Sequence, residues 1–213
     1  MRAMVAIFNT NAAACTGILG WVLTDLIRHR GRFSIIGACE GAIAGLVGIT
    51  PAAGFVSLWL AACIGFITAI ICALLQNINA WLRIDDGMDV FKLHGVGGMV
   101  GAFLTGIFAT EGISGLDGAT FQGGALDGVG VQVGRQLAEL CAISGYAFSV
   151  SCLLLYAINV VPGLRLRVDE ETEVVGLDRM QFVDGEIGTC GMSVIEGVRS
   201  SPSPTREMVV GAK

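Results

Sequence analysis

One histidine lies inside a stretch that is long and apolar enough to cross a bilayer. His94 falls within residues 88–108, an apolar stretch with several glycines after the histidine. An ionisable side chain inside a membrane span is costly, so it usually faces a pathway or a partner. Glycine offers a small surface on which another helix can pack closely. These glycines are Gly95, Gly97, Gly98, Gly101 and Gly106. We expect His94 to line a pathway, and the alternative is a structural histidine bonded to a backbone carbonyl of a neighbouring helix.

Three carboxylates precede this histidine at the start of the same stretch. We expect Asp85, Asp86 and Asp89 to cap open N–H groups, because the helix dipole favours negative charge at the amino end. Asp89 lies five residues before His94 and so on a different helical face, which makes a direct carboxylate–imidazole pair unexpected. Lys92 is close enough to the boundary of the span for its ammonium group to reach the interface.

A fourth carboxylate, Glu40, lies about two turns into another apolar segment, within the small-residue run 37–47. Two roles are open for it: a bond to a neighbouring helix end or polar backbone, and a place in an internal vestibule. Motifs that pair a nucleophile with a base, such as Gly-x-Ser-x-Gly, do not occur in the sequence. Residues 95–98 also lack the Lys-Ser/Thr that follows a phosphate-binding loop. We therefore do not expect an enzyme.

The composition indicates a membrane protein. The chain is 54% hydrophobic and 15% charged, with a mean hydropathy of +0.72, which is too apolar for a soluble domain of this length. Its seven cysteines are scattered singly, so neither a metal centre nor a cofactor is expected. A basic field for nucleic acid is absent from the sequence. The predicted fold class is all-α, a polytopic helical bundle in the lipid bilayer.

Five spans can be delimited from apolar runs near the ~20 residues that cross the hydrocarbon. We expect them at about 3–27, 34–55, 56–81, 87–109 and 135–161, within a transmembrane region of residues 1–164. Pro51 and Gly54 interrupt the apolar run between the second and third spans, so the chain can turn there. Residues 165–213 are acidic and then of low complexity, which predicts a tail that is largely disordered towards its end.

Positive charge alternates between the connections. Arg28, Arg30 and Arg32 follow the first span, and arginines also follow the third and fifth spans, whereas residues 50–57 and 110–134 contain neither Lys nor Arg. The positive-inside rule therefore places the arginine-bearing loops and the tail in the cytosol. With five spans, the amino end then enters from outside. We interpret this, in a chain without a leader pattern, as a sign of further spans upstream.

Two long stretches, occurring in this order, carry a resemblance to a known family. Residues 41–55, GAIAGLVGITPAAGF, and residues 85–98, DDGMDVFKLHGVGG, resemble the ammonium transporter (Amt/Mep/Rh) family, with the fungal and plant-like Amt/Mep branch nearer than the Rh branch. Shorter matches at 104–108, 163–167 and 176–178 extend the resemblance over about residues 3–188. It implies a plasma-membrane homotrimer of eleven-span subunits, of which this chain would supply the last five spans, that takes ammonium or ammonia.

The resemblance also assigns residues to the pore. His94 matches the second of the family's twin pore histidines, and the first would lie on a span that this chain lacks. Val90, Phe91 and Val100 are candidates for apolar packing around the pore, and Glu40 is one for its vestibule. The implied mechanism is deprotonation of ammonium at an outer vestibule and passage of ammonia, with or without a relayed proton, along an apolar pore.

The tail keeps only part of the family pattern. Gly176, Leu177 and Asp178 match the start of the motif that docks under a neighbouring subunit, whereas the Ala-Tyr at its end is missing. Ser201 and Ser203 each precede a proline, which makes them candidate sites for proline-directed phosphorylation, and the alternative is that these Ser-Pro pairs are only part of a polar linker. The alternative to a conducting protein is a non-conducting truncated subunit that regulates or poisons full-length transporters.

Overall fold

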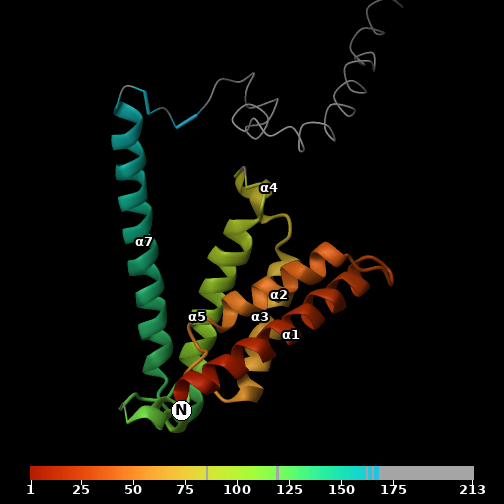
Figure 1. Ribbon diagram of the computed structural model, residues 1–213, viewed down its shortest axis with the longest axis vertical. Coiled ribbons are helices and arrows are strands. Elements are labelled where there is room, and N and C mark those ends of the chain that lie inside the picture. Colours follow the sequence, from red (N-terminus) through yellow and green to blue (C-terminus); the bar gives the residue numbers. More distant parts are fainter. Residues whose placement is uncertain (85, 119, 162, 165, 168–213) are drawn as a thin grey trace, which may run out of the picture. The chain divides into compact units, whose positions relative to one another are not determined.

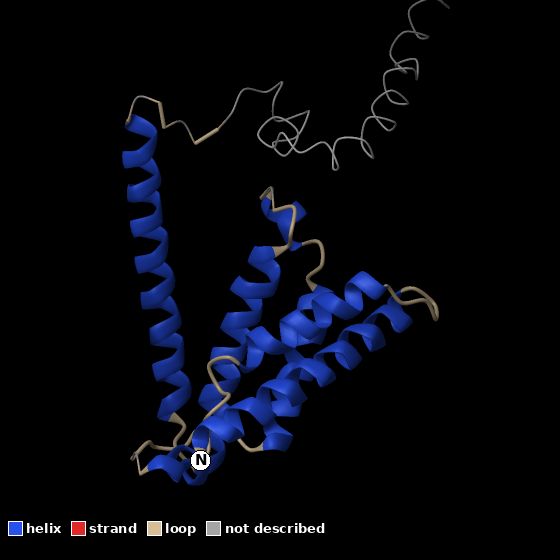
Figure 2. Cartoon of the chain, in the orientation of Figure 1, coloured by secondary structure: helices blue, strands red, loops and turns tan. Residues whose placement is uncertain are grey.

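The computed structural model describes residues 1–84, 86–118, 120–161, 163–164 and 166–167. Within these residues every regular element is helical (Figure 2), so the all-α prediction is confirmed. In chain order they are α1 (Arg2–Arg28), α2 (Ile35–Ile49), α3 (Leu58–Leu74), α4 (Ile78–Leu82), η1 (Phe91–Val96), α5 (Gly97–Phe108), α6 (Glu111–Ser114), η2 (Gly115–Asp117), η3 (Ala125–Asp127) and α7 (Val131–Val160). The first of the η elements, η1, is a π-helix, and the other two are short 3₁₀ turns.

The first three long helices, α1, α2 and α3, pack against one another, and α5 packs against α2 and α3 (Figure 1). Small residues let these backbones approach closely. A Cβ atom added at Gly17 would meet the carbonyl oxygen of Gly41, and one added at Gly45 would meet that of Ala13. Such close contact lets dispersion forces hold helices together in a solvent that is itself apolar.

The helix ends follow local chemistry. Ser34 caps α2, because its hydroxyl accepts a hydrogen bond from the Gly37 N–H at 3.2 Å. Gly31 has a φ of +88° in the turn after α1, a conformation that glycine adopts without steric cost. At the other side, α2 ends before Pro51, which cannot continue a helical hydrogen-bond ladder. Arg28 donates to the carbonyl of Ala73 at 2.8 Å and so satisfies an open acceptor at the end of α3.

The predicted spans and the observed helices agree in order and differ in length. Among the described residues, three helical segments are long and apolar enough to cross a membrane, namely Arg2–Arg28, Phe91–Phe108 and Val131–Val160. The other two apolar helices, Ile35–Ile49 and Leu58–Leu74, are shorter than the predicted 34–55 and 56–81. The chain turns through residues 50–57 between them, and it turns again after α3 before the short α4. The count of five spans therefore stays a prediction.

The glycines after His94 differ in what they contact. Gly101 lies against the backbone of Gly48 in α2, and Gly97 lies against the side chains of Val47, Thr68 and Cys72. These two match the expected close packing of helices. Gly95, by contrast, faces only the ring of Phe91 in its own helix.

The chain divides into two compact units, residues 1–148 and residues 149–213, and α7 runs through the boundary between them. The site described below lies within the first unit. The predicted tail residues Gly176, Leu177, Asp178, Ser201 and Ser203 lie outside the described residues, as does Asp85.

Candidate functional site

His94 lies in the π-helix η1, which leads directly into α5. Its side chain is exposed in this chain, and among the described residues its imidazole forms no hydrogen bond or ion pair. The other histidine, His29, lies 3.9 Å from the Asp25 carboxylate at the end of α1. A bond from His94 to a neighbouring backbone carbonyl, the structural alternative, is thus not formed within the described part of the chain.

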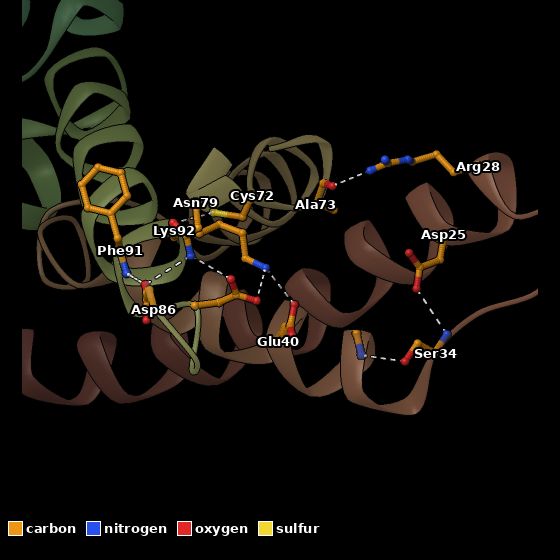
Figure 3. Close-up of polar contacts among 12 residues, drawn as sticks. Asp25, Arg28, Ser34, Glu40, Cys72, Ala73, Asn79, Asp86, Phe91 and Lys92 are labelled. Carbon is orange, nitrogen blue, oxygen red and sulfur yellow. Dashed lines mark hydrogen bonds and ion pairs between the residues drawn. The ribbon is translucent and has the colours of Figure 1, made fainter. Parts of the chain in front are cut away.

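Two residues before His94, a lysine is fully buried. Lys92 has 0% exposure, and its Nζ donates to Asp89 Oδ2 at 2.9 Å. The same nitrogen donates to Glu40 Oε2 at 3.3 Å (Figure 3). The same nitrogen lies 5.2 Å from the centre of the Trp21 ring, within range of a cation–π interaction. Lys92 therefore links η1 to α2 and to α1, as well as to the turn that precedes it.

This position corrects the expectation for Lys92. We expected its ammonium group to reach the interface, and it instead points into the packed helices. The physical reason is that Glu40 and Asp89 supply carboxylates inside, together with the face of a tryptophan. A charge buried with hydrogen-bonded counter-charges avoids most of the cost of leaving water.

The turn before η1 is held by a second set of contacts. Asn79, itself buried, donates through Nδ2 to Asp89 Oδ1 at 2.9 Å and to Asp86 Oδ2 at 3.3 Å. Asp89 has a φ of +55°, a left-handed conformation that is uncommon for a residue other than glycine. Carboxylate contacts on both sides, from Asn79 and from Lys92, stabilise that strained backbone.

The two acidic residues of this set that the structure describes, Asp86 and Asp89, have different contacts. Asp86 Oδ2 accepts the Phe91 N–H at 2.7 Å, at the first residue of η1. This hydrogen bond lowers the pKa of the Asp86 carboxyl below its ordinary value. Asp89 instead forms an ion pair with Lys92.

The three candidates for apolar packing around the pore differ in burial. Val100 packs against the buried cluster that includes Ile49 and Leu104. Val90 and Phe91 are exposed, and the Phe91 ring lies over Gly95, beside the turn of His94. Glu40, for which two roles were open, bonds to a side chain of another helix rather than to a helix end or a backbone group.

Sequence reasoning missed the set of contacts that joins Glu40, Asp89, Lys92, Asn79 and Trp21. One signal was available, since Glu40 and Lys92 are opposite charges in two apolar segments, and such charges tend to pair with one another. Nothing in the local pattern indicated Asn79, which is polar and lies in the short helix α4.

The site thus combines two environments on a single turn. Lys92 and Leu93 are buried, with Leu93 in a cluster that also contains Trp21 and Cys72, whereas His94 is exposed. A neutral imidazole on a helix with this apolar composition can donate or accept one hydrogen bond and can exchange a proton. That chemistry suits a small polar solute which moves along the helix.

The sequence of this chain is similar to those of known transporters. Residues 1–187 match the sequence model of the Ammonium Transporter Family. The chain is 44% identical over 184 residues to Ammonium transporter 1 of Schizosaccharomyces pombe, covering 85% of this chain and 37% of that protein. It is 40% identical over 206 residues to Ammonium transporter MEP2 of Saccharomyces cerevisiae, covering 95% of this chain and 41% of that protein. The chain therefore spans about two fifths of the length of these relatives.

Solved structures agree with the sequence matches. The crystal structure of Candida albicans Mep2 superposes with a TM-score of 0.76 at 46% identity, over 86% of this chain and 40% of that chain. Saccharomyces cerevisiae Mep2 gives a TM-score of 0.75 at 43% identity, over 80% and 38% respectively. With a family match along most of its length and helices arranged as in these structures, this chain belongs to the ammonium transporter family.

Proposed function

We propose that this chain is the carboxyl-terminal portion of an ammonium transporter, which conducts ammonium or ammonia through a histidine-lined apolar pore. The family match and the names of the relatives support transport of ammonium. The apolar segments α1, α2, α3, η1–α5 and α7 would then be the last five of eleven spans. In the complete protein we expect a homotrimer in the plasma membrane, with the carboxyl end in the cytosol.

The observation that carries this proposal is the state of His94. Its imidazole is exposed and, among the described residues, unbonded, on a helical segment apolar enough to cross a membrane. A polar ring in such a segment is unfavourable against lipid, so it is best explained by a pathway that it faces. Ammonia forms when ammonium has lost its proton, and it enters the pore without its hydration water. Neutral His94 would form hydrogen bonds with this ammonia, and it could relay a proton.

The exposed ring of Phe91 beside His94 would provide part of an apolar wall. Glu40, on α2, is bonded to Lys92, so we assign it to the support of the pathway rather than to its lining. The tail residues would act separately, by docking of residues 176–178 and by phosphorylation at Ser201 and Ser203.

The test is uptake of radiolabelled methylammonium, and growth on low ammonium, in a yeast host without its own ammonium transporters. The chain is expressed by itself and, in parallel, in place of the segment of MEP2 to which it aligns. His94→Ala should reduce uptake per surface-expressed molecule by about tenfold or more, because a group that meets the solute directly is removed. Unchanged uptake by His94→Ala in the conducting form would exclude the pore role.

A second function, that of a non-conducting subunit which regulates full-length transporters, has its own supporting observation. Several large apolar side chains of α1 are exposed, among them Phe8, Leu19 and Ile27. Such faces suit burial against other helices as well as against lipid. Co-expression with intact MEP2 separates the two functions, because a regulatory subunit would co-purify with MEP2 and lower its uptake, whereas a conducting chain would restore growth without it.

A further inference from the structure

The ammonium group of Lys92 is the most completely buried charge in the described chain, and it lies on the same helical turn as His94. Burial of a lysine without compensation costs several kcal/mol, so its place requires the partners that surround it. These partners come from three separate parts of the chain: Glu40 on α2, Trp21 on α1, and Asp89 in the turn before η1. Lys92 is thus anchored in three directions.

The backbone of the same turn is fixed as well. The Cys72 thiol lies 3.6 Å from the Lys92 carbonyl oxygen, as a donor to it, and the Leu93 N–H donates to the Asp89 carbonyl at 2.9 Å. Asp86 accepts the N–H of Phe91 one residue earlier. Phe91 and Lys92 therefore each have a backbone contact to a side chain outside η1, whereas the Leu93 N–H forms a regular i→i−4 helical hydrogen bond.

These anchors determine the direction of the histidine. Positions two apart on a helix lie about half a turn from one another, so a buried Lys92 requires that His94 face the opposite side. The turn is also a π-helix, a form that is rare and recurs at functional sites. A rotation of η1 about its axis would expose Lys92 and turn the imidazole towards the packed helices, and the ion pairs oppose that rotation.

We propose that Lys92, held by Glu40, Asp89 and Trp21, is a positioning residue that fixes the rotation of η1 and so keeps the His94 ring on its exposed face. This inference rests on the pore role of His94 for its functional consequence, but not for its structural one. The buried ion pairs of Lys92 thus orient the histidine that would meet the solute.

The structural consequence can be measured directly, because the chain has only two histidines. With ¹³C,¹⁵N-labelled histidine, the full chain in lipid nanodiscs gives ring signals for His29 and His94 alone, assigned by His29→Gln. Lys92→Met should shift, split or broaden the His94 signal and leave that of His29 in place. Arg83→Gln, which removes an exposed charge near the end of α4, is the matched control and should change neither signal.

A second pair of variants changes α2, distant in sequence from the histidine. Glu40→Ala removes one of the two carboxylate partners of Lys92, the one that joins it to α2, and it should perturb the His94 signal as Lys92→Met does. Glu40→Gln keeps an oxygen acceptor of the same shape, and its spectrum should stay close to that of the original chain. This pair remains informative if Lys92→Met fails to fold. An unchanged His94 signal in folded Glu40→Ala and Lys92→Met proteins would overturn the positioning role.

Transport supplies the functional measurement. In the uptake assay described above, Lys92→Met and Glu40→Ala should lower the maximal rate per surface-expressed molecule by about tenfold, because a small misplacement of a functional group can cost up to ~10²-fold. The KM should change by less than about twofold, because a misplaced His94 would slow passage of the solute rather than weaken its first binding. A purely structural role would lower the amount of surface protein and leave the rate per molecule unchanged.

The two proposals fail in different ways. If His94→Ala conducts normally while Lys92→Met shifts the His94 signal, the pore role is wrong and the positioning role stands. If His94→Ala abolishes uptake while Lys92→Met and Glu40→Ala keep both the His94 signal and the rate, the positioning role is wrong and the pore role stands.

Discussion

Lys92 and His94 are two residues apart and have opposite surroundings, which is the feature that organises this site. Burial of Lys92 depends on carboxylates from α2 and from the preceding turn, whereas His94 is exposed. A buried ion pair often contributes little to net stability when compared with apolar residues of the same shape. We therefore assign this pair to the placement of η1 rather than to stability.

Asn79 supports the same turn from α4, and its removal should be costly. Asn79→Ala would remove both hydrogen bonds to the carboxylates of Asp86 and Asp89. We expect a loss of about 1–3 kcal/mol in the free energy of unfolding, because a buried donor to a charged group is lost next to a strained backbone. Asn77→Ala is the matched control, since Asn77 is exposed and makes no capping hydrogen bond. Equal thermal midpoints for the two variants in detergent would contradict this role.

The Asp86 carboxyl predicts a dependence on pH. The Phe91 N–H lowers its pKa in the folded chain, so the charged form stabilises the fold. This contribution is present above the ordinary carboxyl pKa of about 4, and it disappears as the pH falls through the lower pKa of the folded state. The difference in thermal midpoint between the original chain and Asp86→Asn should therefore be present at pH 7 and shrink in strong acid. A difference that grows as the pH falls would exclude this assignment.

At the scale of helices, small residues determine how closely α2 and α5 approach. A Cβ at Gly101 would meet the carbonyl oxygen and the Cα of Gly48, which are backbone atoms that cannot move aside. A Cβ at Gly98 would meet only a Val47 methyl at 3.9 Å, an ordinary contact. The two positions lie in the same helix, so they share the same gain in helix propensity on substitution.

Gly101→Ala and Gly98→Ala should thus have opposite effects. Gly98→Ala should leave stability unchanged or raise it by up to about 1 kcal/mol through helix propensity. Gly101→Ala should lower it by about 1–3 kcal/mol, because overpacking forces the two helices apart. Thermal unfolding of both variants in the same detergent measures the difference. A Gly101→Ala protein as stable as Gly98→Ala would show that the contact with Gly48 is looser than the structure has it.

The same scale shows how far the sequence predicts the fold. Apolar runs predicted the order and approximate bounds of the main helices, because hydrophobicity over about 20 residues is a local property. They overestimated the length of α2 and α3, since apolar turn residues such as Ala52 and Val56 continue the run without continuing the helix. The pairing of Glu40 with Lys92 could not be predicted from the local sequence, because the two residues are 52 positions apart in the chain. Only the packing of α2 against η1 brings them together.

For the whole molecule, the distribution of arginines makes a prediction about the two sides of the membrane. The loop after α1 carries three arginines, and the segment 110–134 carries Glu111, Asp117 and Asp127 with no basic residue. The positive-inside rule then places the first in the cytosol and the second outside. Sequence alone predicts this orientation, since the bias in positive charge acts while the chain is inserted.

Single cysteines can test the orientation in a background without the seven native cysteines. Phe33→Cys reports on the arginine loop and Thr120→Cys on the acidic segment, and both original side chains are exposed. An impermeant thiol reagent on intact cells should label position 120 and reach position 33 only after permeabilisation. Labelling of position 33 but not of position 120 on intact cells would reverse the orientation. The Lys92 and Asp89 end of the His94 helix would then face outside, and it would meet the solute before the histidine does.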